Sequence, residues 1–114
     1  MDANTFMKHR RKRFERTEAT FINKGAEYDS IENPFNNFEE GIGMSTSNTR
    51  EAVAYGFLIK HLQSIKTIIG QYDRDRTLPT EGLIIEKFGD AIAYLTILEA
   101  MFLERQHQTN DTKQ

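Results

Sequence analysis

Hydrophobic residues near the C-terminal end of the chain recur at alternating steps of four and three. They lie within residues 81–105 and comprise Ile84, Phe88, Ala91, Leu95, Leu98 and Phe102. This spacing places side chains on one face of an α-helix. With a rotation of about 100° per residue, a second apolar face carries Leu83, Ala93, Ile97 and Met101. We therefore predict a central helix over residues 81–105 that is buried on two sides, with the first set as its core seam.

Two patterns predict helices in the first third of the chain. Residues 5–24 carry three apolar side chains at intervals of seven, namely Met7, Phe14 and Phe21. This spacing predicts a helix that Gly25 ends. Residues 34–40 are expected to form a short helix, because Asn33 is a good N-cap and a proline follows it at the first helical position. Gly41 would end this short helix.

A further long helix is predicted over residues 50–69. Asn48 and, three residues later, Glu51 resemble a capping box at its start, and Gly70 is a natural C-cap. Its apolar stripe consists of Tyr55, Leu58, Leu62, Ile65 and Ile69. We expect a charged loop over residues 71–80 and a frayed polar tail after Arg105.

Three long helices and one short helix predict an all-α helical bundle. The chain has 114 residues, which fits one helical domain over residues 1–106 followed by a polar flexible tail over 107–114. Three such helices alone bury little apolar surface. We therefore expect a homo-oligomer, a dimer or tetramer, in which the bundle is completed between subunits.

Composition limits the chemistry that the chain can perform. It has no cysteine, which excludes disulfides, thiolate metal ligands and cysteine nucleophiles. A metal ion must use oxygen or imidazole ligands, and a carboxylate-rich site suits Mg²⁺ or Mn²⁺. No apolar run approaches the roughly 20 residues needed to span a bilayer, and the first residues lack a signal-peptide pattern. We expect a soluble cytoplasmic protein that has no membrane contact.

Charge is unevenly distributed along the chain. Residues 8–16 carry six basic side chains against Glu15, a charge of +5, and because the whole chain carries −2 the remainder carries −7. This basic segment would suit phosphates of nucleic acid, an anionic ligand or the acidic surface of a host protein. Without stacking aromatic residues or a DNA-binding motif, nucleic acid is not the expected partner. A solvated helix face stays the alternative.

Glu86 and Asp90 are the first candidate functional residues. They are four residues apart, so they lie one above the other on the second apolar face of the central helix, beside Ala93 and Ile97. Ionised carboxylates in such surroundings need a metal, a base or hydrogen-bond donors. Two interpretations stay open: a divalent-metal or acid–base site, and structural salt bridges or exposed acids near the helix N-terminus.

Other candidate polar side chains lie in residues 26–44 and in the helix over 50–69. The first group comprises Glu27, Tyr28, Asp29, Asn36, Asn37, Glu39 and Glu40. Such residues either line a polar site or form turns. Lys60 and His61 flank the apolar stripe of the helix. A lysine can neutralise a phosphate, and a histidine can bind an anion or accept a proton, but both are also common surface residues.

An ordered set of these residues resembles a known family. The set comprises residues 24–28, Asn37-Phe38, Lys60-His61, Ser64-Ile65, Glu86-Lys87, Asp90-Ala91 and Tyr94-Leu95. Over about residues 23–103 the chain is similar to small phage-encoded proteins related to the all-α nucleoside triphosphate pyrophosphohydrolase superfamily, whose fold is MazG-like. Members are helical dimers or tetramers that use magnesium to cleave a nucleoside triphosphate into its monophosphate and pyrophosphate.

The resemblance implies roles for individual residues. The implied metal ligands are Glu39, Glu40, Glu86 and Asp90. Catalysis would rest on Glu86, Asp90 and Lys60, since phosphoryl transfer depends on positioning and charge neutralisation. The implied substrate-binding residues are Tyr28, Asn37, Phe38, Lys60 and His61. The lysine and histidine would offset phosphate charge, and the other three would contact the base by stacking and hydrogen bonding.

The chain departs from the family signature in two respects. That signature has a glutamate and an aspartate three residues apart on the last helix, whereas Glu86 and Asp90 are four apart. The helix over residues 50–69 offers only Glu51 where several acids are expected. Two alternatives therefore stand beside the hydrolase: a non-catalytic nucleotide-binding protein that sequesters or regulates a nucleotide, including one used in host defence, and a small helical protein that binds a host factor.

Overall fold

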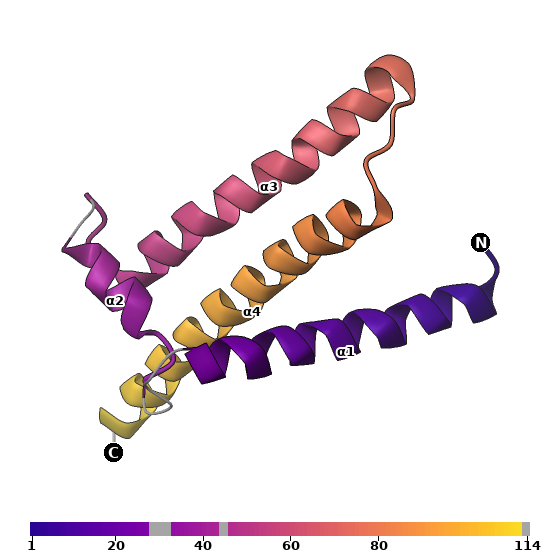
Figure 1. Cartoon of the computed structure of the whole chain (residues 1–114). Coiled ribbons are helices and arrows are strands. Elements are labelled where there is room, and N and C mark those ends of the chain that lie inside the picture. Colours follow the sequence, from indigo (N-terminus) through magenta and orange to yellow (C-terminus); the bar gives the residue numbers. More distant parts are fainter. Residues whose placement is uncertain (28–32, 44–45, 113–114) are drawn as a thin grey trace. The chain divides into compact units, whose positions relative to one another are not determined.

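The computed structural model describes residues 1–27, 33–43 and 46–112, with side chains for 1–23, 33–43 and 46–109 (Figure 1). It has helices α1 (Ala3–Glu27), α2 (Asn36–Ile42), α3 (Arg50–Asp75) and α4 (Glu81–Thr112). In this part of the chain all regular secondary structure is helical, which confirms the all-α class with three long helices and one short one. The chain divides into two compact units, unit 1 (Met1–Pro34) and unit 2 (Phe35–Gln114).

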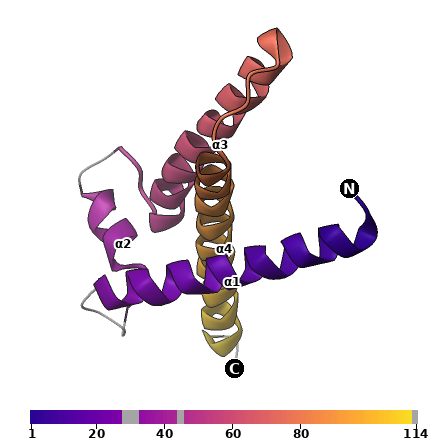
Figure 2. The same ribbon diagram turned by 45° about the vertical axis from the view of Figure 1, so that its right-hand side comes forward.

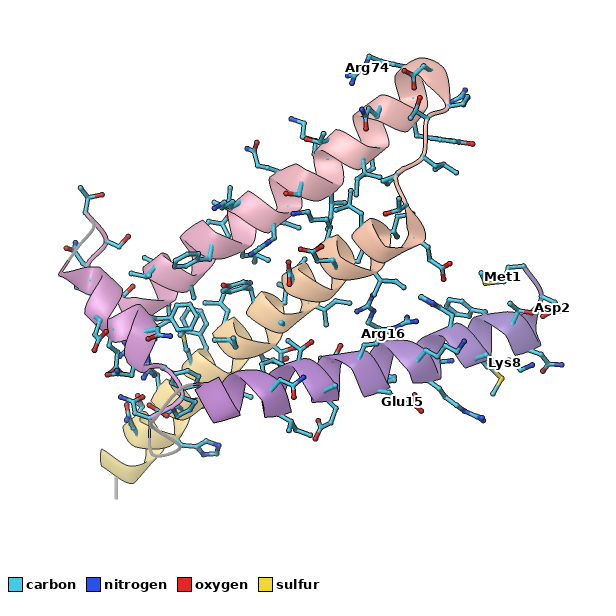
Figure 3. The ribbon with its side chains drawn as sticks, viewed as in Figure 1. Met1, Asp2, Lys8, Glu15, Arg16 and Arg74 are labelled. Carbon is cyan, nitrogen blue, oxygen red and sulfur yellow. The ribbon has the colours of Figure 1, made fainter. Side chains whose placement is uncertain are left out.

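Unit 1 contains α1. Asp2 begins the helix, because its Oδ1 accepts a hydrogen bond of 2.8 Å from the backbone N–H of Thr5. The helix continues past Gly25, so the predicted end at that glycine is wrong. Glycine in a helix costs only about 1 kcal/mol relative to alanine, which does not stop an otherwise helical segment. Lys8 and Arg16 of the basic segment are labelled in Figure 3, and the partner of this segment stays a prediction.

Unit 2 is organised around α3 and α4, which form an antiparallel hairpin connected by residues 76–80 (Figures 1 and 2). The antiparallel register follows from contacts at one end. Arg50, at the start of α3, donates from Nη2 to the carbonyl oxygen of Met101 in the last third of α4, over 3.4 Å. Helix α2 packs against α3.

The core of unit 2 lies where these three helices meet. Its buried members are Phe35, Phe38, Ala54 and Met101, and Val53, Tyr94 and Ile97 pack against them. Gly41 allows the close approach of α2 to α3, because a Cβ atom at this position would lie 2.8 Å from Cγ1 of Val53. Valine is stiff about χ1 and has little room to move aside.

Helix α4 packs mainly with the second of its two predicted apolar faces. Ala93 and Met101 are 2% and 0% exposed, whereas Phe88, Leu95 and Phe102 of the predicted core seam are 39%, 52% and 58% exposed. Ala91 of the same seam is 5% exposed and Leu98 packs against the core, so the prediction that this seam forms the core is correct only in part. Because both faces are apolar, the periodicity does not decide between them, and the packing against α3 selects the face with the small Ala93 side chain.

Several helix ends differ from the predicted ones. Helix α2 runs to Ile42 rather than ending at Gly41, and its N-cap residue is Phe35 rather than Asn33. The N-cap of α3 is Thr49, whose hydroxyl accepts from the Ala52 N–H over 3.1 Å. Helix α3 continues through residue 70 to Asp75, and α4 continues past residue 105 to Thr112.

The structure also bears on the expected absence of a membrane-spanning segment. Within the described residues, no helix is both long enough and apolar enough to traverse a bilayer. The expected homo-oligomer stays a prediction.

Candidate functional site

Two predicted site residues meet across the α3–α4 hairpin. His61 of α3 and Asp90 of α4 approach to 3.7 Å between Nδ1 and Oδ2. This distance is too long for a hydrogen bond. The contact is an ion pair when the imidazole is protonated. The two side chains are 20% and 29% exposed, so the pair is open to solvent on one side.

His61 also belongs to an aromatic cluster whose other members are Phe38, Phe57 and Tyr94. The Tyr94 ring stacks on the His61 ring at 4.9 Å and on the Phe57 ring at 5.8 Å between centroids, with interplanar angles of 21° and 10°. Phe38 of α2 meets Tyr94 edge-on at 6.1 Å and 86°. The arrangement follows from spacing: Phe57 and His61 are four residues apart on α3, and Asp90 and Tyr94 are four apart on α4, so each pair lies on one helix face.

Phe57 and Tyr94 were not predicted as site residues. Tyr94 belongs to the family-like set without an assigned role, and Phe57 was not singled out. Their positions in the sequence could have indicated a role in the site. Phe57 is four residues from His61 and Tyr94 is four residues from Asp90, so each pair is expected to share one face of its helix. Phe57 is 45% exposed, so part of its ring is open to solvent. The ring of Phe38, in contrast, is only 8% exposed and forms part of the core.

Lys60 and Glu86 lie near this pair but outside the cluster. Both are exposed. Lys60 precedes His61, so it is rotated from the imidazole by about 100° around α3. Glu86 lies one turn before Asp90 on α4. Of the two interpretations left open by the sequence, the exposed position of Glu86 agrees with an exposed acid near the helix N-terminus, whereas Asp90 is partly buried and faces His61.

Apart from Phe38, the predicted site residues of α2 lie away from this cluster. Glu39 accepts a hydrogen bond of 3.2 Å from Nη1 of Arg50, and Glu40 accepts one of 3.1 Å from Nδ2 of Asn36. Asn37 is exposed. Tyr28 lies outside the described residues.

A separate charge network links the start of α3 to the last third of α4. Its members are Glu39, Arg50, Glu51, Glu104 and Arg105. Arg50 and Glu51 are 7% and 6% exposed, and they are joined over 3.2 Å between Nε and Oε1. Arg105 donates from Nε to Oε1 of Glu51 and from Nη2 to Oε2, the latter over 3.0 Å. The Arg50 guanidinium also lies over the Phe35 ring, 4.9 Å from its centroid.

The network shifts the protonation of its members. Hydrogen bonds from Arg105 make the largest contribution and lower the pKa of Glu51 to about 2. Burial alone would raise this pKa, and a hydrogen bond from Arg50 makes a smaller contribution that lowers it. For Arg50, burial alone would lower the pKa, but hydrogen bonds to Glu51, Glu104 and Glu39 raise it. Both groups are therefore firmly ionised at neutral pH. Sequence reasoning missed this network, since it assigned Glu51 to a helix cap and gave Arg50 and Arg105 no role.

A polar pocket adjoins the charge network. It is lined by Glu39, Ile42, Asn48, Thr49, Arg50, Glu104, Arg105 and Gln108. Its two guanidinium groups already bond to carboxylates of the network. The two arginines are thus outnumbered by Glu39, Glu51 and Glu104, so this pocket does not suit a phosphate group.

The implied metal site is not assembled in the described part of the chain. There, no group of three or more histidine, aspartate or glutamate side chains is placed to hold one ion. Glu86 and Asp90 remain together on α4, while Glu39 and Glu40 bond to Arg50 and Asn36. Among the described residues, Glu86 and Asp90 thus offer two carboxylates one helical turn apart.

Comparisons of the chain with protein-family models, with curated proteins and with solved structures found no match. The relation to MazG-like proteins therefore stays a prediction from the sequence.

Proposed function

We propose that unit 2 binds a nucleotide on the α3–α4 hairpin, beside the His61–Asp90 pair. The observation that carries this proposal is that His61 meets both Asp90 and the ring of Tyr94, and that Phe38 meets the same ring. Phe38, His61 and Asp90 were each candidate site residues in the sequence analysis, and they lie on three different helices, α2, α3 and α4. A nucleotide combines an aromatic base with anionic phosphates, so its recognition calls for an aromatic surface with cationic groups near it.

Each residue would contribute through its position. Phe57, at 45% exposure, offers a ring face on which a base can stack. The buried Phe38 would support Tyr94 from behind instead of touching the base. Lys60 is exposed beside the cluster and supplies a positive charge for phosphate, as does His61 when protonated. Asp90 faces His61 Nδ1 and orients the imidazole.

Hydrolysis of a nucleoside triphosphate to its monophosphate and pyrophosphate is the second candidate function. The observation in its favour is the alignment of Glu86 and Asp90, one helical turn apart and both accessible to solvent. A divalent ion bound there would neutralise phosphate charge. The third ligand that the family signature implies is not placed beside them, so binding without cleavage is the better supported function.

Base stacking is tested by isothermal titration calorimetry with a panel of linear and cyclic nucleotides. We expect Phe57→Ala to weaken binding by about 5- to 150-fold, since stacking on one aromatic ring is worth about 1–3 kcal/mol. The matched control is Ile59→Ala, because Ile59 lies on the same helix and is similarly exposed at 39%. Absence of binding by the wild-type chain would rule out the proposal and leave a host protein as the predicted partner.

The metal role is tested with Asp90→Asn, which preserves shape but removes charge. If Asp90 holds a divalent ion, Mg²⁺ raises the melting temperature of the wild type but not of the variant, and pyrophosphate release from triphosphates is lost. An equal rise in both proteins would remove Asp90 from the metal site. Binding with recovery of the intact nucleotide would identify a non-catalytic binding protein.

A further inference from the structure

Lys87 differs from the other basic side chains in the described part of unit 2. Arg50 and Arg105 bond to carboxylates of the charge network. Four other basic side chains are exposed, namely Lys60, Lys66, Arg74 and Arg76. Lys87 is partly buried, and it forms no ion pair with the described residues. A cation that is partly withdrawn from water and has no carboxylate partner is available to an anionic ligand.

Lys87 lies on the face of α4 that carries Asp90 and Tyr94. It precedes Asp90 by three residues and Tyr94 by seven, so the three side chains share one side of the helix. Asp90 and Tyr94 both meet His61 of α3 across the hairpin. Seven residues correspond to about 10 Å along a helix. Lys87 therefore lies about two turns from the aromatic rings, on the side of the connecting residues.

The charges around the His61–Asp90 pair nearly cancel. Lys60 and Lys87 are balanced by Glu86 and Asp90, and His61 adds a positive charge only when it is protonated. A phosphate monoester carries about two negative charges at neutral pH, and a triphosphate carries more. Because Glu86 and Asp90 lie within one turn of Lys87, they would repel the additional phosphates. Without a divalent ion, the site suits a nucleotide that has one phosphate group.

We propose that the ligand of the α3–α4 hairpin is a nucleoside monophosphate and that Lys87 holds its phosphate. This inference rests on the proposed nucleotide binding and names the ligand class and a further binding residue. The base stacks on Phe57, and the phosphate lies toward the connecting residues, on the other side of the sugar. The ammonium group of Lys87 donates up to three hydrogen bonds to it, and the long flexible stem lets that group adjust to the ligand.

The proposal is tested by calorimetry in EDTA with adenosine, guanosine, cytidine and thymidine, each compared with its monophosphate and its triphosphate. We expect the monophosphate to bind the wild type at least about tenfold more tightly than the nucleoside, the size of effect that a hydrogen bond to a charged group has. Lys87→Gln should remove most of this advantage and leave the affinity for the nucleoside unchanged. Lys87→Arg, which keeps the charge, should retain it.

The matched control is Lys66→Gln, because Lys66 is an exposed lysine on α3 outside the cluster. This variant should keep the full advantage of the monophosphate over the nucleoside. Circular dichroism checks that the variants keep their helices. The comparison of monophosphate with triphosphate uses the wild type alone, so it tests the ligand class even where a variant does not fold.

Three results would overturn the inference. They are a triphosphate that binds more tightly than the monophosphate in EDTA, a nucleoside that gains nothing from its phosphate, and an equal loss of nucleoside and monophosphate affinity in Lys87→Gln. Each of them leaves nucleotide or nucleoside binding at the hairpin intact. A wild type that binds no member of the panel would instead remove the proposed function, and this inference with it.

Discussion

The α3–α4 hairpin is joined by two ionic contacts of very different character. In the charge network, Glu51 is 6% exposed and bonds to both Arg50 and Arg105. Nearer the connecting residues, His61 and Asp90 stand 3.7 Å apart and are 20% and 29% exposed. Both carboxylate oxygens of Glu51 accept from arginines within the chain, whereas the His61–Asp90 pair is not hydrogen-bonded and is open to a ligand. The difference separates a contact that holds the hairpin from one that is open to binding.

The two contacts are also expected to contribute differently to the free energy of unfolding. Removing one partner from a buried ion pair strands the other charge away from water, while a part-exposed pair is largely screened. The charge network is therefore expected to dominate stability, and the His61–Asp90 pair to contribute little. Three measurements test this contrast.

The largest effect is expected for Glu51→Gln. The amide cannot neutralise Arg50 and Arg105, so the variant should lose roughly 3 kcal/mol of unfolding free energy, measured from the urea midpoint and slope. Glu86→Gln is the control, because Glu86 is exposed on α4 and its replacement should change stability by less than about 0.5 kcal/mol. Equal losses in the two variants would contradict a structural role for the network.

Acid should weaken the wild type through the same carboxyl group. The pKa of Glu51 falls from 4.5 in the unfolded chain to about 2 in the folded one. The folded state therefore binds this proton less tightly, so the stabilisation is complete above pH 4.5 and is lost as the pH falls toward 2. The loss is up to about 3 kcal/mol by linkage.

Urea unfolding of wild type and Glu51→Gln across this pH range measures the effect. The difference in unfolding free energy between them should shrink as the pH falls. A constant difference would show that Glu51 does not titrate in this way.

The smallest effect is expected for Asp90→Asn. Because the His61–Asp90 pair is partly exposed and beyond hydrogen-bond distance, its loss should cost less than about 1 kcal/mol in urea unfolding. The same variant is expected to change ligand or metal response, so stability and binding would separate. A loss as large as that of Glu51→Gln would place Asp90 among the residues that hold the hairpin.

Much of the helical architecture was predictable from local pattern. Apolar steps of three and four located α3 and α4, apolar residues seven apart located α1, and the Asn33–Pro34 pair indicated the short helix α2. Thr80 before α4 agrees with the predicted start at Glu81, since its hydroxyl accepts from the Leu83 N–H over 3.2 Å. The ends were less predictable, because glycines at 25 and 70 were absorbed into longer helices. The packed face of α4 was not predictable either: Ala93 and Leu95 lie on opposite apolar faces, and only the pairing with α3 distinguishes them.

The site was predictable as separate residues and not as an arrangement. Carboxylate and imidazole chemistry pointed to Asp90 and His61, but their meeting depends on the antiparallel register of two helices, which no local pattern contains. The charge network shows the limit more clearly. The sequence pattern assigned Glu51 to a helix cap. Its partner Arg105 lies 54 residues further along the chain, so no local pattern connects the two residues.

The reversal between α3 and α4 rests on an arginine in a conformation that favours glycine. Arg76 has φ 63° and ψ 20°, its backbone N–H donates to the Tyr72 carbonyl, and its side chain folds back over the Tyr72 ring at 5.1 Å. The peptide bond between Arg76 and Thr77 lies in this exposed connection, where a protease that cleaves after arginine can reach it. Once cut there, the chain would be two peptides, held together by contacts that include those of α2 and α3 with α4.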